Sequence, residues 1–458
     1  MSETLDLARQ ALAAAGSDDA LATVTRERST LLRFARSRPT QATSVDDTTI
    51  EIAALHEGHV GRAATNRTDR DALAQCARTA RLAAEAAAGA GERGHFPGFP
   101  APAPVRTHHG YDTTTARLDP TTGGDALRAA FEVAERAGVE IGGAWTAGEV
   151  DTAIASSTGV ELSDRVTDCF MKTIATAASG RTGYAAQAGV ATSSIDARAI
   201  AQQAADKALL PGDPVALEPG EHNVVFEPHA VAELLWTLAE TAFDGLAHAE
   251  GRGALTGRLG TRVVSPAINL SDSARFGSTL PRAFDAEGVP KAPLPLVQDG
   301  VAHRVVHDTR SAAILGGATA STGHALVAGG QASRPRPANF VMAGGGAADE
   351  TELCAPIERG IYVTRLWYTN VVRAPETLFT AVTRDGTFLI EDGRVTRPVA
   401  DMRITDSALG ILARVQALGS RSVLTADGEF YGRRFATGSV CPALRADGVR
   451  FSGSAAAS

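Results

Sequence analysis

The first candidate for chemistry is the sequence HEGH at 56–59. A zinc site on a helix needs two histidines four residues apart on one face, with a glutamate between them. Here the spacing is three, and the motif continues an alternating pattern that includes Ile50 and Ile52. Such alternation predicts a strand, on which the two histidines point to opposite faces. We therefore interpret this motif as part of a strand and loop.

A second histidine pair, His303 and His307, has the spacing of a helical metal site. The surrounding sequence GVAHRVVHDTR is typical of a strand and turn, on which four residues separate side chains by roughly 13 Å. Two nitrogens bound to one zinc ion, each about 2.1 Å from it, cannot lie that far apart. His108, His109 and His324 occur in turn-rich segments, and we expect them to face solvent.

Phosphate-binding and nucleophile motifs are also missing. The glycine-rich segments 313–323 and 344–350 match neither a P-loop nor a dinucleotide-binding fingerprint. The sequence contains no GxSxG elbow. Taken residue by residue, the sequence therefore offers no catalytic constellation.

Composition excludes several classes of protein. The 458 residues carry a formal net charge of −8 and no basic block, which argues against a nucleic-acid partner. No apolar stretch approaches the roughly 20 residues that span a bilayer, and the N-terminus does not resemble a signal peptide. The four cysteines are far apart and form no CxxC pair, so a disulfide framework is not expected. We predict a cytoplasmic protein without a membrane segment.

The hydrophobic patterns predict an α+β fold with two domains. Helices and antiparallel strands alternate in the first half, which predicts an antiparallel sheet with helices. After the Pro-rich run 210–223 we expect a helix over 228–244, and then mainly strands until a late helix at 406–418. The expected domains are residues 1–215, with an α+β fold, and residues 218–458, a β-rich domain with few helices.

Residues 357–404 form the most informative stretch. They predict a strand meander, with tight turns at Asp385-Gly386 and Asp392-Gly393 reversing the chain. The first strand concentrates large polar and aromatic groups, although the whole chain has only 3 Trp and 5 Tyr. These groups are Tyr362, Arg365, Trp367, Tyr368 and Asn370.

The segment RGIYVTRLWYTNVVRAPETLFTAVTRDGTFLIEDGRVTRPVADMRITDSALGIL resembles the C-terminal domain of the TldD/PmbA family. The segments LPLVQDGVAHRVVHDTRSA and GRLGTRVVSPAINLSD are similar to the same family. The C-terminal CPALRADGVRFSG and the N-terminal layout around 65–85 also fit. The resemblance covers nearly the whole chain.

The resemblance implies where catalytic groups should lie. TldD-type members are zinc peptidases with an HExxxH helix and a cysteine ligand near the C-terminus. An ungapped count back from residues 257–260 places Trp236, Thr237 and Thr241 at the first His, the Glu and the last His of that motif. An indole has no lone pair for a metal, and neutral Thr is a poor zinc ligand and no general base. The cysteine position falls near Gly428, where no cysteine occurs.

This pattern resembles the TldE (PmbA) branch, which implies a non-catalytic subunit. Its partner would be a TldD-like metallopeptidase subunit that carries the zinc, and this chain would hold no cofactor itself. The substrates implied are unfolded or short peptides, including precursors of ribosomally made natural products. The run 360–373 is our candidate for a peptide-binding edge or a subunit interface, although simple packing also explains its composition.

Three alternatives remain open from the sequence. The chain could be a metallopeptidase by itself, with unrecognised ligands such as His303 and His307. It could be a regulatory or binding protein that is not an enzyme. It could also form a homo-oligomer through the surface expected to bind the partner.

Overall fold

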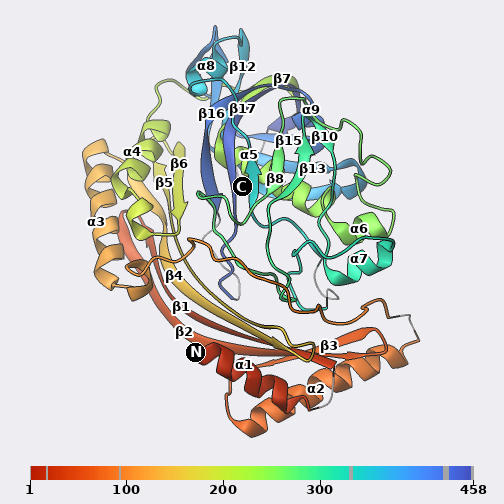
Figure 1. The fold of residues 1–458 in the computed structure, drawn as a ribbon. Coiled ribbons are helices and arrows are strands. Elements are labelled where there is room, and N and C mark those ends of the chain that lie inside the picture. Colours follow the sequence, from red (N-terminus) through yellow and green to blue (C-terminus); the bar gives the residue numbers. More distant parts are fainter. Residues whose placement is uncertain (1, 17–18, 92–93, 330–333, 427–432, 455–458) are drawn as a thin grey trace.

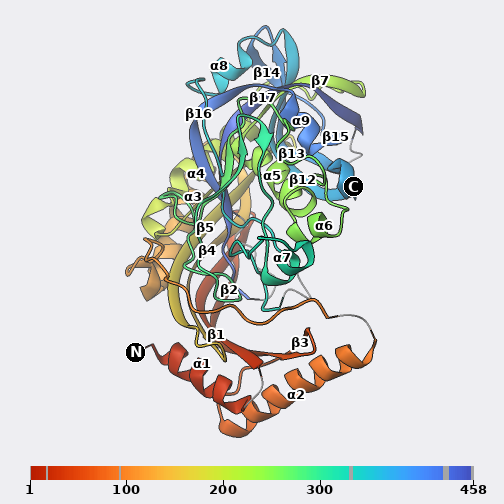
Figure 2. The same ribbon diagram turned by 45° about the vertical axis from the view of Figure 1, so that its right-hand side comes forward.

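The computed structural model describes residues 2–16, 19–91, 94–329, 334–426 and 433–454. Figures 1 and 2 show two sheets packed against each other, one built from each half of the chain. The strands of the N-terminal sheet are long and strongly curved, and they wrap around the C-terminal half. The predicted α+β class is confirmed.

The N-terminal sheet is fully antiparallel, with the order β3-β2-β1-β4-β5-β6. Four helices cover its outer face (Figure 1), and their alanines pack closely against it. Asp69, Asp119 and Asp196 begin three of these helices by accepting hydrogen bonds from backbone N–H groups of the first turn. The strands are β1 (Asp19–Ala35), β2 (Arg38–His56), β3 (His59–Thr65), β4 (Glu140–Ser156), β5 (Glu161–Thr176) and β6 (Thr182–Gly189); the helices are α1 (Glu3–Ala14), α2 (Arg70–Gly89), α3 (Pro120–Ala137) and α4 (Ala197–Ala208).

The C-terminal sheet is mixed, and part of it closes into a ring of the strands β7, β12, β13, β15 and β17. Helix α5 packs against β12 and β17 of this ring with an almost wholly apolar face. The strands are β7 (Gly220–Phe226), β8 (Leu270–Asp272), β9 (Leu294–Gln298), β10 (Val301–Ala302), β11 (Phe340–Met342), β12 (Arg359–Arg373), β13 (Leu378–Glu391), β14 (Arg394–Pro398), β15 (Met402–Ser407), β16 (Val415–Ala426) and β17 (Gly438–Ser454); the helices are α5 (Pro228–Thr241), α6 (Gly245–Ala249), α7 (Thr309–Leu315), α8 (Glu350–Cys354) and α9 (Ala408–Ala413).

Four predictions of local structure were wrong. The motif HEGH forms the turn between β2 and β3, so His56 and His59 are cross-strand partners and lie on the same face of the sheet. The helix expected over 228–244 ends at Thr241, and Asp244 starts the separate helix α6 by accepting hydrogen bonds from two backbone N–H groups. Asp385-Gly386 does not reverse the chain, because β13 continues through it with a shift of register against β12. The late helix spans only 408–413, since the residues before it pair with β13 as β15. Asp392-Gly393 does form a turn, between β13 and β14.

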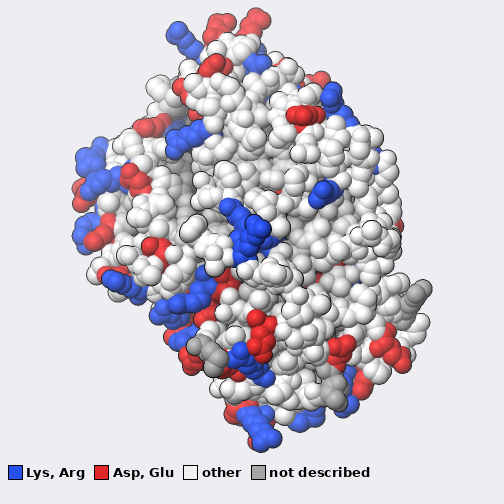
Figure 3. Space-filling view, viewed as in Figure 1, with Lys and Arg blue, Asp and Glu red and all other residues white. Residues whose placement is uncertain are grey.

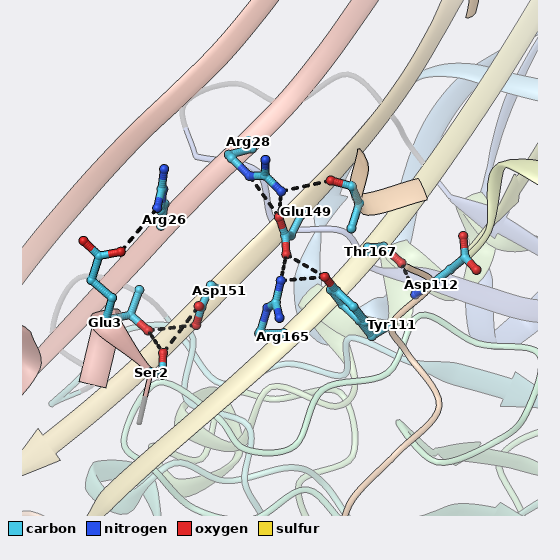
Figure 4. Close-up of polar contacts among 12 residues, drawn as sticks. Ser2, Glu3, Arg26, Arg28, Tyr111, Asp112, Glu149, Asp151, Arg165 and Thr167 are labelled. Carbon is cyan, nitrogen blue, oxygen red and sulfur yellow. Dashed lines mark hydrogen bonds and ion pairs between the residues drawn. The ribbon is translucent and has the colours of Figure 1, made fainter. Parts of the chain in front are cut away.

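A polar network holds β1, β4 and β5 together on the outer face, beside the first helix (Figure 4). The Glu149 carboxylate accepts hydrogen bonds from Arg28 and Arg165 and from the Tyr111 hydroxyl. Burial alone raises the pKa of Glu149, but these hydrogen bonds outweigh it and hold the pKa below its ordinary value. Arg28 and Arg165 are both paired with the Glu149 carboxylate, so we interpret the network as structural.

Candidate functional site

A cavity of about 510 Å³ lies between the two halves of the chain. The N-terminal sheet contributes the inner faces of β5 and β6, and the C-terminal half contributes α5, β12 and the adjoining ends of β16 and β17. Aromatic side chains dominate the lining: Phe170, Tyr184, His229, Trp236, Phe340, Trp367 and Tyr368. Two of the three tryptophans in the chain therefore meet at one site.

Arg365 links the two walls of this cavity. Its guanidinium lies over the rings of Tyr184, 4.4 Å from the centroid, and Trp367, 4.9 Å from the centroid. The same guanidinium binds the Asp385 carboxylate, with 2.8 Å between Nε and Oδ2. Asp385 has a φ of 54°, at the register shift of β13 described above. The irregular backbone at Asp385-Gly386 thus positions the carboxylate that binds Arg365.

Trp367 and Tyr368 lie at a bulge of β12. Two residues, Tyr368 and Thr369, stand between the cross-strand pairs of Trp367 and Asn370, and Tyr368 has a φ of 57°. Such bulges redirect side chains and are common next to binding sites. Trp367 is 46% exposed and Tyr368 is 74% exposed, so both rings border the cavity without being buried in it.

Helix α5 supplies the wall where the resemblance placed a zinc motif. Trp236 borders the cavity and is 44% exposed, whereas Thr237 and Thr241 are buried on another side of the helix. The Thr237 hydroxyl donates to the carbonyl of Glu233 at 2.9 Å, and that of Thr241 donates to the carbonyl of Thr237 at 2.7 Å. The two threonine hydroxyls donate to carbonyls of their own helix, and an indole has no lone pair for a metal, so these three positions do not fit a zinc ion.

The polar groups of the cavity carry little net charge. Burial lowers the pKa of His229 to about 4, so this ring is neutral at pH 7. Its edge meets the ring of Tyr184, with 5.1 Å between centroids. Asp385 offsets the charge of Arg365, and the lining contains one further cation, Lys172, and one carboxylate, Glu233. The cavity therefore favours an uncharged apolar group.

The other residues selected from the sequence lie elsewhere. Tyr362 packs with Phe388 in a cluster near α8 and does not border the cavity. Asn370 is exposed and donates to the carbonyl of Tyr368 at 2.8 Å. The position expected for the family cysteine, near Gly428, lies outside the described residues.

The histidines of the second half do not form a site together. His303 is exposed and His307 is buried, and burial lowers the pKa of His307 to about 4. His108 and His324 were predicted to face solvent, which is wrong. The His108 side chain is 7% exposed with its Nε2 2.8 Å from Asp164, and His324 is buried with its Nε2 3.1 Å from Asp272. Across the described parts of the chain, no three His, Cys, Asp or Glu side chains are grouped to hold a metal ion. In the same parts, no helix has the length and apolarity needed to cross a membrane.

Sequence reasoning missed the N-terminal wall of the cavity. Phe170 and Tyr184 lie on neighbouring strands, nearly 200 residues before β12, and each stands among buried residues as in any strand. No local motif marks them, because only the packing of the two sheets brings them to Arg365.

Models of one protein family match three successive parts of the chain. Models of the PmbA/TldA metallopeptidase match domain 1 to residues 22–84, the central domain to 108–210 and the C-terminal domain to 219–453. The metalloprotease TldD homolog of Haemophilus influenzae is 26% identical over 237 residues, covering 50% of this chain and 47% of that protein. A metalloprotease of Methanothermobacter thermautotrophicus is 25% identical over 201 residues, covering 44% and 43%. The chain thus matches these curated relatives over about half their length.

Among solved structures, TldE from Thermococcus kodakarensis superimposes with a TM-score of 0.84. The superposition covers 98% of this chain and 99% of that one, at 19% identity. Similarity at this level of identity shows a shared fold.

Proposed function

Because this chain belongs to the PmbA/TldD metallopeptidase family, we propose that it is a TldE-like subunit of a heterodimeric peptidase. In this proposal the TldD-like partner holds the zinc ion and the general base. The present chain completes the enclosure in which unfolded or short peptides, including natural-product precursors, are cut. We place this complex in the cytoplasm, since all four cysteines are buried free thiols.

The observation that carries the proposal is the chemistry of α5. At the three positions that match the family's zinc motif stand an indole, Trp236, and two hydroxyls, those of Thr237 and Thr241. Both hydroxyls donate to backbone carbonyls of their own helix, and neither can take a proton from water at neutral pH. A chain with this helix needs a second subunit to supply peptidase chemistry.

Two further features support a partner subunit. The overall likeness to a TldE structure extends over nearly the full chain. Figure 3 shows that Lys, Arg, Asp and Glu side chains gather on the N-terminal half and at the top of the view, around α8, whereas much of the visible face of the C-terminal half between them is uncharged. The cores of subunit interfaces are depleted of charge in this way. Among the residues of the run 360–373, Tyr362 and Asn370 do not border the cavity. We propose that these two residues stabilise the fold or contact the partner.

The test is co-expression with a TldD-like protein that carries HExxxH. We expect the two chains to co-purify and to cleave unfolded peptides together, with activity lost on chelation of zinc. This chain alone should show no peptidase activity and bind no stoichiometric zinc. Activity of the isolated chain that a chelator removes would overturn the proposal, as would a complex whose activity does not depend on this chain.

We also propose that the chain divides into domains at 1–215 and 218–458. The connecting residues 211–214 are exposed, and β7 of the second sheet begins only at Gly220. Limited proteolysis should cut first within 211–220 and leave two resistant fragments, and an initial cut elsewhere would contradict this division.

A further inference from the structure

One edge of β12 is open where it reaches the cavity. Along one side β12 pairs with β13 over its whole length, but on the other side it pairs with β7 only from Gly360 to Val363. Beyond Val363, no strand within the described residues pairs with this second edge. An unpaired strand edge presents backbone N–H and C=O groups in a row, and the molecule that complements such a row is another extended chain.

The open edge borders the cavity directly. Five successive residues, 365–369, line it. Successive side chains of a strand point to opposite faces, so residues of both faces can line one cavity only when the edge between them faces it. The bulge at Tyr368 adds to this arrangement, because it turns the strand at the cavity mouth.

The walls beside this edge suit a flat apolar side chain. Trp236 from α5 and Trp367 from β12 expose much of their surface to the cavity, and Phe170 and Tyr184 close it from the N-terminal sheet. Because Asp385 offsets Arg365 and His229 is neutral, the site gives a charged group no net attraction. A volume of about 510 Å³ lies within the usual range for ligand sites.

We propose that an extended peptide adds as a strand to the edge of β12 at 365–369 and inserts a Phe, Tyr or Trp side chain into the cavity. The site binds the peptide without forming or breaking a covalent bond. Its role as a site that presents substrate to a catalytic partner rests on the proposed function, whereas the binding itself is a property of this chain alone. In this proposal the non-catalytic subunit selects the peptide that its partner cleaves.

The chain supplies its own reporter for the test. Of its three tryptophans, Trp236 and Trp367 border the cavity, and Trp145 is buried in the N-terminal core. The probe is a short acetylated and amidated peptide with one central Phe among Ala and Thr, titrated into the full chain. We expect a saturable change of tryptophan fluorescence, and a Phe→Ala peptide should bind at least about tenfold more weakly. Absence of saturable binding, or equal binding of both peptides, would overturn the proposal.

Two variants locate the site. Trp367→Ala should weaken binding of the Phe peptide at least about tenfold, measured by anisotropy of a labelled probe. Trp236→Ala, on a different element, should do the same and guards against misfolding of one variant. The control is Leu82→Ala, which removes an exposed apolar side chain on α2, outside the cavity lining. Unchanged affinity in both tryptophan variants would refute this site.

Strand addition makes a distinct demand on the peptide backbone. Successive amides of an extended chain point to opposite sides, so only every second amide can face β12. Two N-methylated forms of the Phe peptide, methylated on alternate sets of amides, should therefore differ. One should lose binding about tenfold or more and the other should keep it. Equal affinities of the two forms would exclude binding by strand addition.

Failures of the two proposals can be told apart. If the complex cleaves peptides but neither it nor the isolated chain loses peptide affinity on Trp367→Ala, the peptide site is wrong and the subunit role stands. If the isolated chain binds the Phe peptide through the cavity but no TldD-like partner gains activity from it, the peptide site stands and the subunit role is wrong.

Discussion

Arg434 and Asp168 form a buried bidentate ion pair that joins the two sheets. Their side chains are 2% and 4% exposed, and the Arg434 Nε and Nη2 atoms lie 2.8 and 2.7 Å from the two carboxylate oxygens. The third nitrogen of Arg434 donates to the Thr146 hydroxyl at 3.0 Å, and its backbone N–H donates to Glu27 at 2.8 Å. The segment that leads into β17 is thereby attached to the inner face of β1, β4 and β5, just beside the cavity.

Removal of this arginine should destabilise the chain strongly. Arg434→Ala leaves the Asp168 carboxylate buried without its partner, and we expect a loss of about 3 kcal/mol in the free energy of unfolding, measured with urea. The control is Arg198→Ala, which breaks an ion pair with Glu132 whose side chains are 52% and 45% exposed. That change should cost far less than the loss of Arg434. A loss in Arg434→Ala no larger than in the control would contradict the structural role of the pair.

Gly148 makes room for the same guanidinium. A Cβ atom at this position of β4 would overlap Nε of Arg434, far inside van der Waals contact. Gly148→Ala should therefore cost about 2 kcal/mol in the parent chain, because an overfilled site forces its neighbours to move. The cost should be much smaller in Arg434→Ala, since the obstructing atoms are gone.

Gly124→Ala is the matched control for the comparison of Gly148→Ala in the parent chain and in Arg434→Ala. It lies in α3, no atom lies within 4 Å of the added Cβ, and alanine is the better helix former. We expect it to leave the free energy of unfolding unchanged or slightly higher in both backgrounds. Strictly additive costs of Gly148→Ala and Arg434→Ala would show that the two residues do not interact as described.

Periodicity was sufficient to predict the fold class because each half has its own pattern. Alternation in strands such as β2 and the alanine-rich helices capped by Asp69 and Asp196 follow local rules. Local rules failed where a neighbouring strand decided the outcome. Asp385-Gly386 has the composition of a turn, yet β12 pairs with β13 both before and after it, so β13 continues through it as an irregular strand. The other edge of β13 pairs with β15 before this point and with β14 after it.

Only part of the cavity lining could be predicted from the sequence. Arg365, Trp367 and Tyr368 lie close together in one strand, so the sequence alone indicated a binding surface there. Phe170 and Tyr184 were not visible, because the contact between β6 and β12 depends on how two separate sheets pack. Tyr362 was grouped with the surface by its type alone, and packing near α8 separates it from the cavity.

The two threonines of α5 should be dispensable for activity. Thr237→Val and Thr241→Val keep the volume and remove only a hydroxyl that donates to a carbonyl four residues earlier. In the complex with a TldD-like partner, we expect peptidase activity within about twofold of the parent and a change in unfolding free energy below about 1 kcal/mol.

Leu238→Ala controls for the sensitivity of that helix. Leu238 is fully buried between the two positions, and its truncation should cost about 3 kcal/mol. A loss of activity of about a hundredfold in either valine variant, at unchanged stability, would mean that a threonine takes part in the chemistry after all.

Glu287 and Asp285 give the chain a pH dependence of stability. Both carboxyls are buried in one turn: Glu287 accepts from the Thr309 backbone N–H at 3.1 Å, and Asp285 accepts from the Glu287 backbone N–H at 2.9 Å. Burial raises the pKa of each, and the Asp285 charge adds to the rise at Glu287. The folded chain therefore holds protons that the unfolded chain has released, and the free energy of unfolding falls as the pH rises above the ordinary carboxyl range.

Glu287→Gln should flatten this dependence, since glutamine is neutral at every pH. The measurement is urea unfolding of parent and variant from about pH 5 to about pH 9, and the difference between them should grow in favour of the variant as the pH rises. The difference also removes the opposite contribution of His307, whose burial lowers its pKa to about 4. In the control Glu132→Gln the altered residue is exposed and pairs with Arg198, so the difference from the parent should stay small across this range. A pH-independent difference between the parent and Glu287→Gln would show that Glu287 is ionised in the folded chain throughout.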